Sequence, residues 1–288
     1  MSKLLFISLF FALAGVISTW SIGYLLAKPN QREIGSPPSD FSAINVAIPN
    51  DGKESIAGWY SEGNPQFGGV LLLHSVRSNR LEMVERAKFL NAAGYSVLLI
   101  DMQAHGETNG ELITFGYLES SDANLAFQYL KRLIDDRPVG IIGVSLGGAA
   151  AILGNRPIPA DAMVLEAVYS SIEQAVGNRI AIRLGEFGRM LSPLLLWQIE
   201  PRLGVSLDKL SPIASISNIN APTMIVSGTE DLHTLPSEAK KMFDLAPEPK
   251  ILWMVEGASH QNLHRYSKDK YEKNILQFFN RYLKRKAS

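Results

Sequence analysis

The pentapeptide Gly143-Val144-Ser145-Leu146-Gly147 constrains the fold of this chain more than any other stretch. An apolar run at 138–142 precedes it and small residues at 148–152 follow it, which predicts a strand, a sharp turn and a helix. In such a turn the serine backbone is strained, and glycines flank it because larger side chains would meet neighbouring backbone. The pattern predicts a nucleophile elbow that holds the Ser145 hydroxyl in the open.

A glycine-rich loop without chemistry is the alternative for Ser145, since the five-residue pattern also occurs by chance. If the elbow forms, the first backbone N–H groups of the following helix face the space above the serine. Such groups stabilise an oxyanion that develops there. The N–H of Leu146 is the candidate donor.

Apolar runs and helical patterns alternate on both sides of this turn, which predicts a mostly parallel sheet with helices on both faces. The predicted strands are 69–74, 95–100, 138–142, 162–165, 223–226 and 251–255, and the predicted helices are 81–93, 118–134, 236–245 and 266–284. A hairpin is predicted from 43–48 and 55–60, around Pro49-Asn50-Asp51-Gly52. Between 169 and 219 the alternation stops, which predicts a helical cap insertion at about 170–219 over the C-terminal strand ends.

Residues 4–27 carry no charge, and a helix of that length spans a bilayer. We expect an uncleaved signal anchor at 1–28, a cleaved signal peptide being the alternative. A polar, proline-containing linker at 29–40 should make few contacts, and 41–288 should fold as one domain to whose core the anchor contributes nothing.

The 28 basic and 28 acidic residues balance, so no global field favours nucleic acid as a partner. The chain has no cysteine, which excludes a thiol nucleophile and cysteine-based metal sites. A nucleophile here must therefore be an oxygen or a nitrogen.

Two strands after the elbow end in residues that would complete a serine triad. The strand at 223–226 leads to Asp231, and the strand at 251–255 leads to His260. Parallel strands in open α/β sheets place their active sites at these ends. His260 would act as base and Asp231 would fix its tautomer, although the neighbouring Glu230 could take the acid role and Asp231 could be a helix cap.

The four other histidines have simpler interpretations. His74 and His105 follow strands and should be buried, hydrogen-bonded structural rings. His233 should lie at the rim of the site, and His264 should be a solvated residue before the last helix.

The chain resembles α/β-hydrolase fold serine hydrolases of the serine aminopeptidase-like and dienelactone hydrolase-like branch, including membrane-anchored Bem46-like members. The segments that carry the resemblance are Leu71-Leu72-Leu73-His74, Asp101-Met102-Gln103-Ala104-His105-Gly106-Glu107-Thr108, Gly143-Val144-Ser145-Leu146-Gly147-Gly148, Ser227-Gly228-Thr229-Glu230-Asp231 and Gly257-Ala258-Ser259-His260. The resemblance implies a second oxyanion donor at the N–H of Val76. The chain departs from the family at Ser75, where glycine is usual, and at Ala104, where arginine is usual.

We therefore expect a membrane-anchored hydrolase that cleaves an ester or thioester through an acyl-Ser145 intermediate, with no cofactor and no metal. A peptidase or amidase is the alternative among enzymes, and a catalytically silent scaffold or binding module is the alternative of another class. The expected partners are a small acyl substrate and, through residues 4–27, the lipid bilayer. The apolar segment 191–197 fits either an acyl pocket or a packed cap helix. Neither the side of the membrane nor the oligomeric state follows from the sequence.

Overall fold

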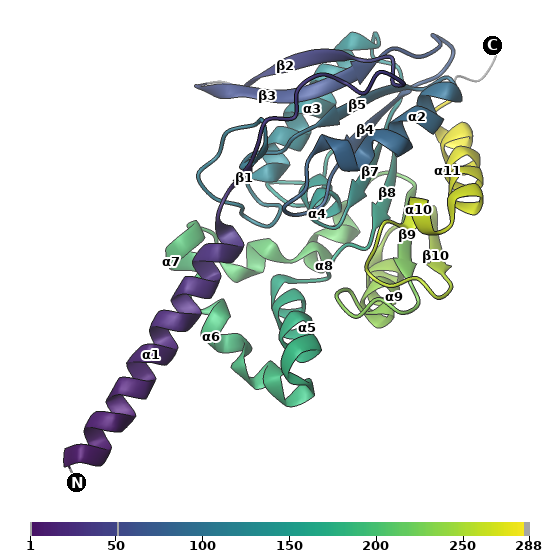
Figure 1. Ribbon diagram of the computed structural model, residues 1–288. Helices are drawn as coiled ribbons and strands as arrows, with labels where there is room; N and C mark the ends of the chain where they lie inside the picture. Colours follow the sequence, from purple (N-terminus) through teal and green to yellow (C-terminus); the bar gives the residue numbers. More distant parts are fainter. Residues whose placement is uncertain (1, 51, 285–288) are drawn as a thin grey trace.

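A central sheet of the described residues has eight strands in the order β10-β9-β8-β7-β4-β5-β3-β2 (Figure 1). The computed structural model describes residues 2–50 and 52–284. Met1, Asp51 and residues 285–288 lie outside this part of the chain. The tip of the expected hairpin and the outer ends of the expected anchor and domain therefore also lie outside it. The strands are β2 (Ile44–Asn50), β3 (Lys53–Ser61), β4 (Gly69–Leu73), β5 (Ser96–Ile100), β7 (Val139–Val144), β8 (Ala162–Glu166), β9 (Thr223–Gly228) and β10 (Lys250–Val255). All neighbours from β10 to β5 pair in parallel, and β2 and β3 form the predicted antiparallel hairpin.

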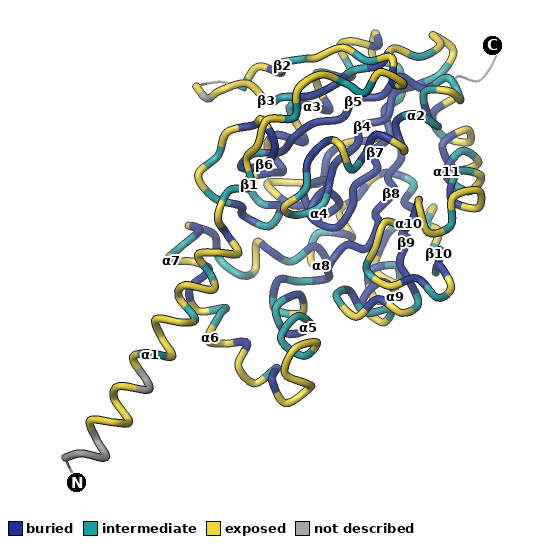
Figure 2. Tube along the Cα trace, viewed as in Figure 1, coloured by how far each residue is buried: buried dark blue, intermediate teal, exposed yellow. Residues whose placement is uncertain are grey.

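Continuous apolar strands form here because both faces of the sheet are covered. Side chains alternate between the faces, so Leu71 and Leu73 lie in one core and Val70 and Leu72 in the other. The helices α3 (Glu119–Leu133), α4 (Leu146–Ile152) and α9 (Pro236–Leu245) contribute to the first core, and α2 (Val84–Ala92) and α11 (Lys268–Tyr282) to the second. In Figure 2 the central strands are buried throughout.

The last helix differs from its predicted single span. Two helices occupy this region, α10 (Leu263–Tyr266) and α11, and Ser267 between them leaves the helical conformation with φ −134° and ψ 52°. The side chain of Asn262 accepts a hydrogen bond from the backbone of Arg265, which begins α10 as a separate capped turn.

The predicted interruption of the sheet is a set of short helices. They are α5 (Ile172–Leu184), η2 (Glu186–Leu191), α6 (Ser192–Leu196), α7 (Ile199–Leu203), η3 (Leu207–Leu210), α8 (Pro212–Ser215) and η4 (Ile216–Asn218). We call α5 through α7 the cap. It lies on the side of the sheet from which α1 (Ser2–Ala27) projects (Figure 1).

The expectation that the segment after α1 makes few contacts is wrong. Strand β1 (Asn30–Gln31) pairs in parallel with β6 (His105–Gly106) as a second, two-stranded sheet. Further along, the N–H groups of Ile34 and Gly35 donate to the carboxylate of Glu107, each at 2.7 Å. The segment is therefore a strap fastened to the domain, because its backbone finds partners in the loop after β5.

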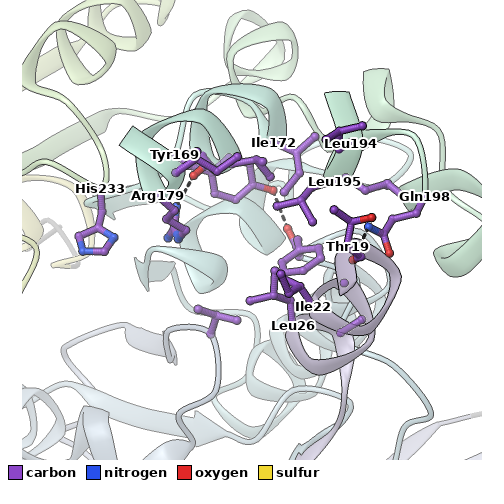
Figure 3. Close-up of a pocket in the computed structure, with 18 of the residues that line it drawn as sticks. Thr19, Ile22, Leu26, Tyr169, Ile172, Arg179, Leu194, Leu195, Gln198 and His233 are labelled. Atoms are coloured by element: carbon purple, nitrogen blue, oxygen red, sulfur yellow. Dashed lines mark hydrogen bonds between the residues drawn. The ribbon is translucent and has the colours of Figure 1, made fainter. Parts of the chain in front are cut away.

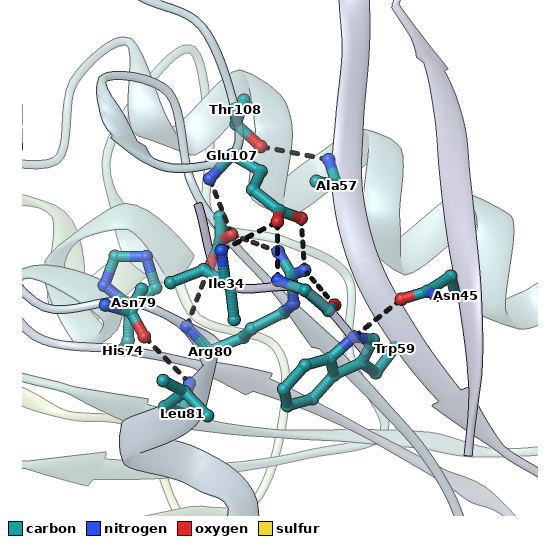
Figure 4. A network of polar contacts seen from close by, with 12 residues as sticks. Ile34, Asn45, Ala57, Trp59, His74, Asn79, Arg80, Leu81, Glu107 and Thr108 are labelled. Carbon is teal, nitrogen blue, oxygen red and sulfur yellow. Dashed lines mark hydrogen bonds and ion pairs between the residues drawn. The ribbon is translucent and has the colours of Figure 1, made fainter. Parts of the chain in front are cut away.

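A buried ion network holds this strap in place (Figure 4). Arg80 forms ion pairs with Asp101, which is fully buried, and with Glu107, and its guanidinium lies 4.6 Å from the ring centre of Trp59. Arg80 and the N–H groups of the strap together lower the pKa of Glu107 to about 2, against the opposing effect of its burial. The end of α1 is also attached to the domain, because Ala27 is buried and its carbonyl accepts a hydrogen bond from the Ile113 N–H at 2.8 Å.

Candidate active site

The turn between β7 and α4 has the strain that the sequence predicts. Ser145 has φ 50° and ψ −107°, a backbone conformation that is rare for a residue with a side chain. A side chain at Gly147 would come within 2.4 Å of the Leu73 carbonyl, and one at Gly143 within 2.5 Å of Gly148. Both glycines are thus required by close backbone approach. Ser145 is 5% exposed and lines a cavity.

The last residue of β8, Glu166, holds the backbone of the elbow. The Ser145 N–H donates to the Glu166 carbonyl at 2.8 Å. The Glu166 side chain, which is buried, is held by Arg86 at 2.7 Å and by the hydroxyl of Tyr271. Burial and the Glu166 carboxylate raise the pKa of Tyr271 well above its usual range, so the phenol stays a hydrogen-bond donor.

The predicted acid and base lie side by side. The strand pairing sets Val255 of β10 opposite Gly228 of β9, so the loops that follow these strands meet. His260 Nδ1 lies 2.7 Å from Asp231 Oδ2, and Asp231 Oδ1 accepts N–H bonds from the backbone of His233 and Thr234. Asp231 is 1% exposed.

Glu230, the alternative acid, is exposed, in contrast to the buried Asp231. The structure brings His260 and Asp231 together, whereas among the described residues His260 has no hydrogen bond to Ser145 Oγ. Next to His260 lies His233. Its ring lies 5.0 Å from that of His260, and it lines the same cavity as Ser145.

The two expected oxyanion donors, Leu146 and Val76, line that cavity with Ser145. Leu146 is the first residue of α4, where backbone N–H groups have no partner inside the helix. Beside Val76, the N–H and hydroxyl of Ser75 both donate to Glu82 at 2.8 Å. The serine that replaces the family's usual glycine therefore fastens the loop.

A pair of buried histidines supports the same loop, as predicted. His105 Nε2 accepts the N–H of Arg77, and His74 Nε2 accepts the N–H of Met102. Both rings are fully buried. Burial and the neighbouring His74 lower the pKa of His105 to about 4, so the ring is neutral at physiological pH. Ala104, where the family usually has arginine, has a left-handed backbone (φ 62°) beside this pair.

His264 is not the solvated residue that was predicted. It is 3% exposed, stacks on Phe89 with ring centres 5.3 Å apart, and lies 2.9 Å from the Glu272 carboxylate. The turn of α10 folds it back against the second core. His233 is half-buried at the cavity wall, which agrees with the predicted rim position.

A cavity of about 550 Å³ lies above Ser145 between the domain, the cap and α1 (Figure 3). Most of its wall is apolar, and the segment 191–197 contributes Leu191, Leu194 and Leu195. Figure 3 shows His233 and Arg179 at one end, and Thr19 and Gln198 at the other. The volume is typical of a site for a small molecule.

Sequence reasoning missed the contribution of α1 to this wall. Thr19, Ile22, Gly23, Leu26 and Ala27 all line the cavity. A signal was present, because small or polar residues four apart on an apolar helix mark a face that packs against protein. Among residues 2–50 and 52–284, no cluster of histidine and carboxylate side chains has the composition of a metal site.

Comparisons with known proteins agree with this geometry. Residues 65–215 match the protein family described as "Serine aminopeptidase, S33". Among curated proteins, the chain is 22% identical to the uncharacterized protein YqkD of Bacillus subtilis, over 80% of this chain and 77% of that one. It is 26% identical to the lysophosphatidylserine lipase ABHD12 of Danio rerio, over 68% of this chain and 52% of that protein.

Solved structures show the same fold. The Pyrococcus furiosus esterase Pf2001 superimposes with a TM-score of 0.73 at 19% identity, over 90% of this chain and 98% of the esterase. An acylaminoacyl peptidase from Pyrococcus horikoshii gives a TM-score of 0.62 at 15% identity, over 86% of this chain and 43% of the peptidase. These likenesses establish the α/β-hydrolase fold, with its mostly parallel sheet and helical insertion.

Proposed function

The chain belongs to the serine aminopeptidase (S33) family of hydrolases, and from this premise we propose that it is a membrane-tethered serine esterase. It would cleave a carboxylic ester or thioester through an acyl-Ser145 intermediate. The observation that carries the proposal is the 2.7 Å contact between His260 Nδ1 and the buried Asp231 carboxylate, in a chain that also holds a strained serine at a cavity.

The proposed reaction has two halves. Ser145 Oγ attacks the acyl carbonyl while His260 Nε2 takes its proton, and Asp231 stabilises the resulting imidazolium. The N–H groups of Leu146 and Val76 would stabilise the oxyanion. As it collapses, the bond to the alcohol or thiol breaks and His260 returns the proton to the leaving group. Water, deprotonated by His260, then attacks the acyl-serine, which releases the acid and restores the hydroxyl.

The charges around the cavity favour an ester over the peptide substrate that the family's name implies. An aminopeptidase has to hold a substrate's free ammonium group, and a carboxylate does this best. Within the described chain no aspartate or glutamate lines the cavity, whereas Arg77, Arg179, Arg183 and Arg202 do. An ammonium group would be repelled by these cations, while a neutral or anionic ester would not.

The proposed tether is α1. Its stretch Phe6–Ala27 has a mean hydropathy of 1.8, and none of its most apolar window is buried in the protein. A helix of this length covers the hydrocarbon core of a bilayer. The curated relative whose printed name includes lysophosphatidylserine lipase acts on a lipid ester, and an apolar cavity beside a membrane helix fits a substrate of that chemical class.

Labelling with a fluorophosphonate probe tests the proposal, because such probes react with an activated serine. We expect the full-length protein in detergent to be labelled and to hydrolyse p-nitrophenyl butyrate, and Ser145→Ala to do neither. Alanyl p-nitroanilide serves as the peptidase substrate, on which we expect little turnover. A well-folded protein that resists the probe would instead be the silent scaffold, and a preference for the anilide would make it a peptidase.

A further inference from the structure

We propose that α1 forms one wall of the acyl-binding cavity, and that the acyl chain enters this cavity from the bilayer between α1 and the cap. The inference rests on the esterase function proposed above. It gives α1 a role in substrate selection beyond that of a tether, and it identifies the substrate as an amphiphile with a long acyl chain.

One face of α1 is part of the cavity. Thr19, Ile22, Gly23 and Leu26 line it, and their spacing of three and four residues places them on a single side of the helix. Leu25 is exposed and is not among the lining residues. Ser145 lines the same cavity, so a chain attached to a scissile ester there can lie against α1.

The helix is held against the cap at a fixed position. Gln198 donates to the carbonyl of Thr19 at 2.9 Å, and Arg202 donates to that of Trp20 at 2.7 Å. The Arg202 guanidinium also lies 4.4 Å from the Trp20 ring centre. At Gly23 a side chain would come within 2.1 Å of Gln198. These contacts fix the position of α1 against the cap, and a helix that forms the wall of a binding site needs such a fixed position.

The beginning of α1 leaves the protein, so the wall continues into the membrane. Phe6, Leu9, Phe10 and Leu13 are more than half exposed, in contrast to Ala27 at the other end, which is 1% exposed. With α1 in a bilayer, the residues that line the cavity lie at or just inside the membrane surface. Trp20 and Tyr24 fit this depth, because aromatic rings favour the headgroup region.

The cap presents a second apolar surface near α1. Its edge, which we call the apolar edge, exposes large hydrophobic side chains: Leu184, Phe187, Met190, Leu191, Leu194 and Trp197. Phe187 is 89% exposed and Met190 80%, and the edge adjoins α1 because α6 packs against it and Trp197 contacts Trp20 at 5.5 Å. Exposed apolar patches continuous with a membrane helix mark a surface that enters lipid.

These surfaces together define a route. A lipid chain at the apolar edge can pass into the cavity without crossing water, because Leu191 and Leu194 belong to both the edge and the cavity wall. The apolar edge thus contacts the bilayer, and the acyl chain enters the cavity between α1 and α6. A short acyl group would bind near Ser145 without contacting α1 or α6.

The test compares chain lengths in the full-length protein, reconstituted in phosphatidylcholine nanodiscs. Ile22→Trp narrows the cavity, and each CH₂ excluded from an apolar site lowers binding about fourfold. If three are excluded, the ratio of p-nitrophenyl palmitate to p-nitrophenyl butyrate turnover should fall by a factor of about 10 to 100. The matched control is Leu25→Trp, on the lipid side of the same helix, for which the ratio should stay within about twofold.

Ile22→Ala provides the opposite change, and it decides the question if the tryptophan variant does not fold. It widens the cavity and should raise the ratio, whereas Leu25→Ala should not. Equal behaviour of the Ile22 and Leu25 variants would overturn the inference while leaving an active esterase. An unlabelled, inactive wild type would instead show that the proposed function itself is wrong.

The apolar edge has its own variant. Phe187→Glu with Met190→Glu should lower palmitate turnover in nanodiscs at least about fivefold relative to butyrate, because charges disfavour insertion into lipid. Leu245→Glu, an equally polar change at an exposed leucine of α9, is the control and should have no such effect. If both variants lose palmitate turnover equally, the chain does not enter across this edge.

Discussion

Two pairs of histidine rings have the same separation in this protein but different surroundings. The ring centres of His74 and His105 are 5.0 Å apart, and so are those of His233 and His260. The first pair is fully buried and each Nε2 accepts a backbone N–H. In the second pair, the side chain of His260 is 23% exposed and its Nδ1 contacts a carboxylate.

The comparison shows which atom decides the role of a histidine. In His74, His105 and His260, Nδ1 faces an oxygen, so this nitrogen carries the proton. The difference lies at Nε2, which is occupied by a backbone N–H in the buried pair. His260 Nε2 has no such partner among the described residues, so of these three rings His260 is the one that can accept a proton from another group.

Removing the available ring should have the largest effect. We expect His260→Ala to lower ester turnover by about 10⁶-fold, as loss of the base does in serine triads, with little change in the urea midpoint. Triad residues act as a unit, so the double variant with Ser145→Ala should be little worse than either single variant. Losses that multiply would contradict a shared mechanism.

Changing the partner of Nδ1 should have the next largest effect. We expect Asp231→Asn to lower turnover about 10⁴-fold, because His260 would then take the other tautomer. Stability should be retained, since Oδ1 can still accept from His233 and Thr234. Glu230→Gln is the matched control, with a change of less than about tenfold. A dead Glu230→Gln beside a working Asp231→Asn would reverse the assignment.

The buried pair should affect stability in a pH-dependent way. The pKa of His105 is about 4 in the folded protein, below its ordinary 6.5, so the wild type loses stability as the pH falls from 6.5 towards 4. At about 1.4 kcal/mol per pKa unit this loss is about 3 kcal/mol.

The variant His105→Gln has no such titration. At pH 7.5 the variant should have a lower free energy of unfolding than the wild type, measured with urea. At pH 4 this difference in free energy should be smaller by about 3 kcal/mol. Titrating carboxylates are common to both proteins and cancel in the comparison. A gap that stays constant with pH would show that the buried ring does not resist protonation.

His233 should matter least, although it is as close to His260 as His105 is to His74. Burial and the neighbouring His260 lower the pKa of His233 below its ordinary value, so the ring is neutral at pH 8. We expect His233→Gln to change turnover at pH 8 by less than about tenfold. A larger loss of kcat with an altered pH profile would make His233 a second acid–base group.

The sheet and the elbow could be predicted from the sequence because buried parallel strands leave uninterrupted apolar runs, such as Val139–Val144. The contact between Asp231 and His260 could also be predicted. Both residues follow the ends of strands that proved to be neighbours, and neighbouring parallel strands end at one edge.

The surface against which α1 docks could not be predicted, because residues that face lipid and residues that face an apolar cavity have nearly the same composition. Thr19 and Gly23 mark the face of α1 that packs against protein, but the residue next to both of them, Gln198, lies far away in the sequence. His264 was misjudged for a similar reason. Its sequence neighbours are polar, but its burial depends on Phe89 from another helix.

The pairing of β1 with β6 decides how far the domain can move relative to α1. A flexible linker of twelve residues would have an end-to-end distance of roughly 20 Å, which is about 5.5 Å times the square root of the residue number. Because the strap is bound to the domain, this freedom of movement is lost. With α1 in a bilayer, the domain and α1 therefore move together as a rigid body. The height of Ser145 above the membrane is then a constant of the fold. Lengthening the segment after Gly35 would leave that height unchanged, because the contacts of β1, Ile34 and Gly35 with the domain all precede the insertion.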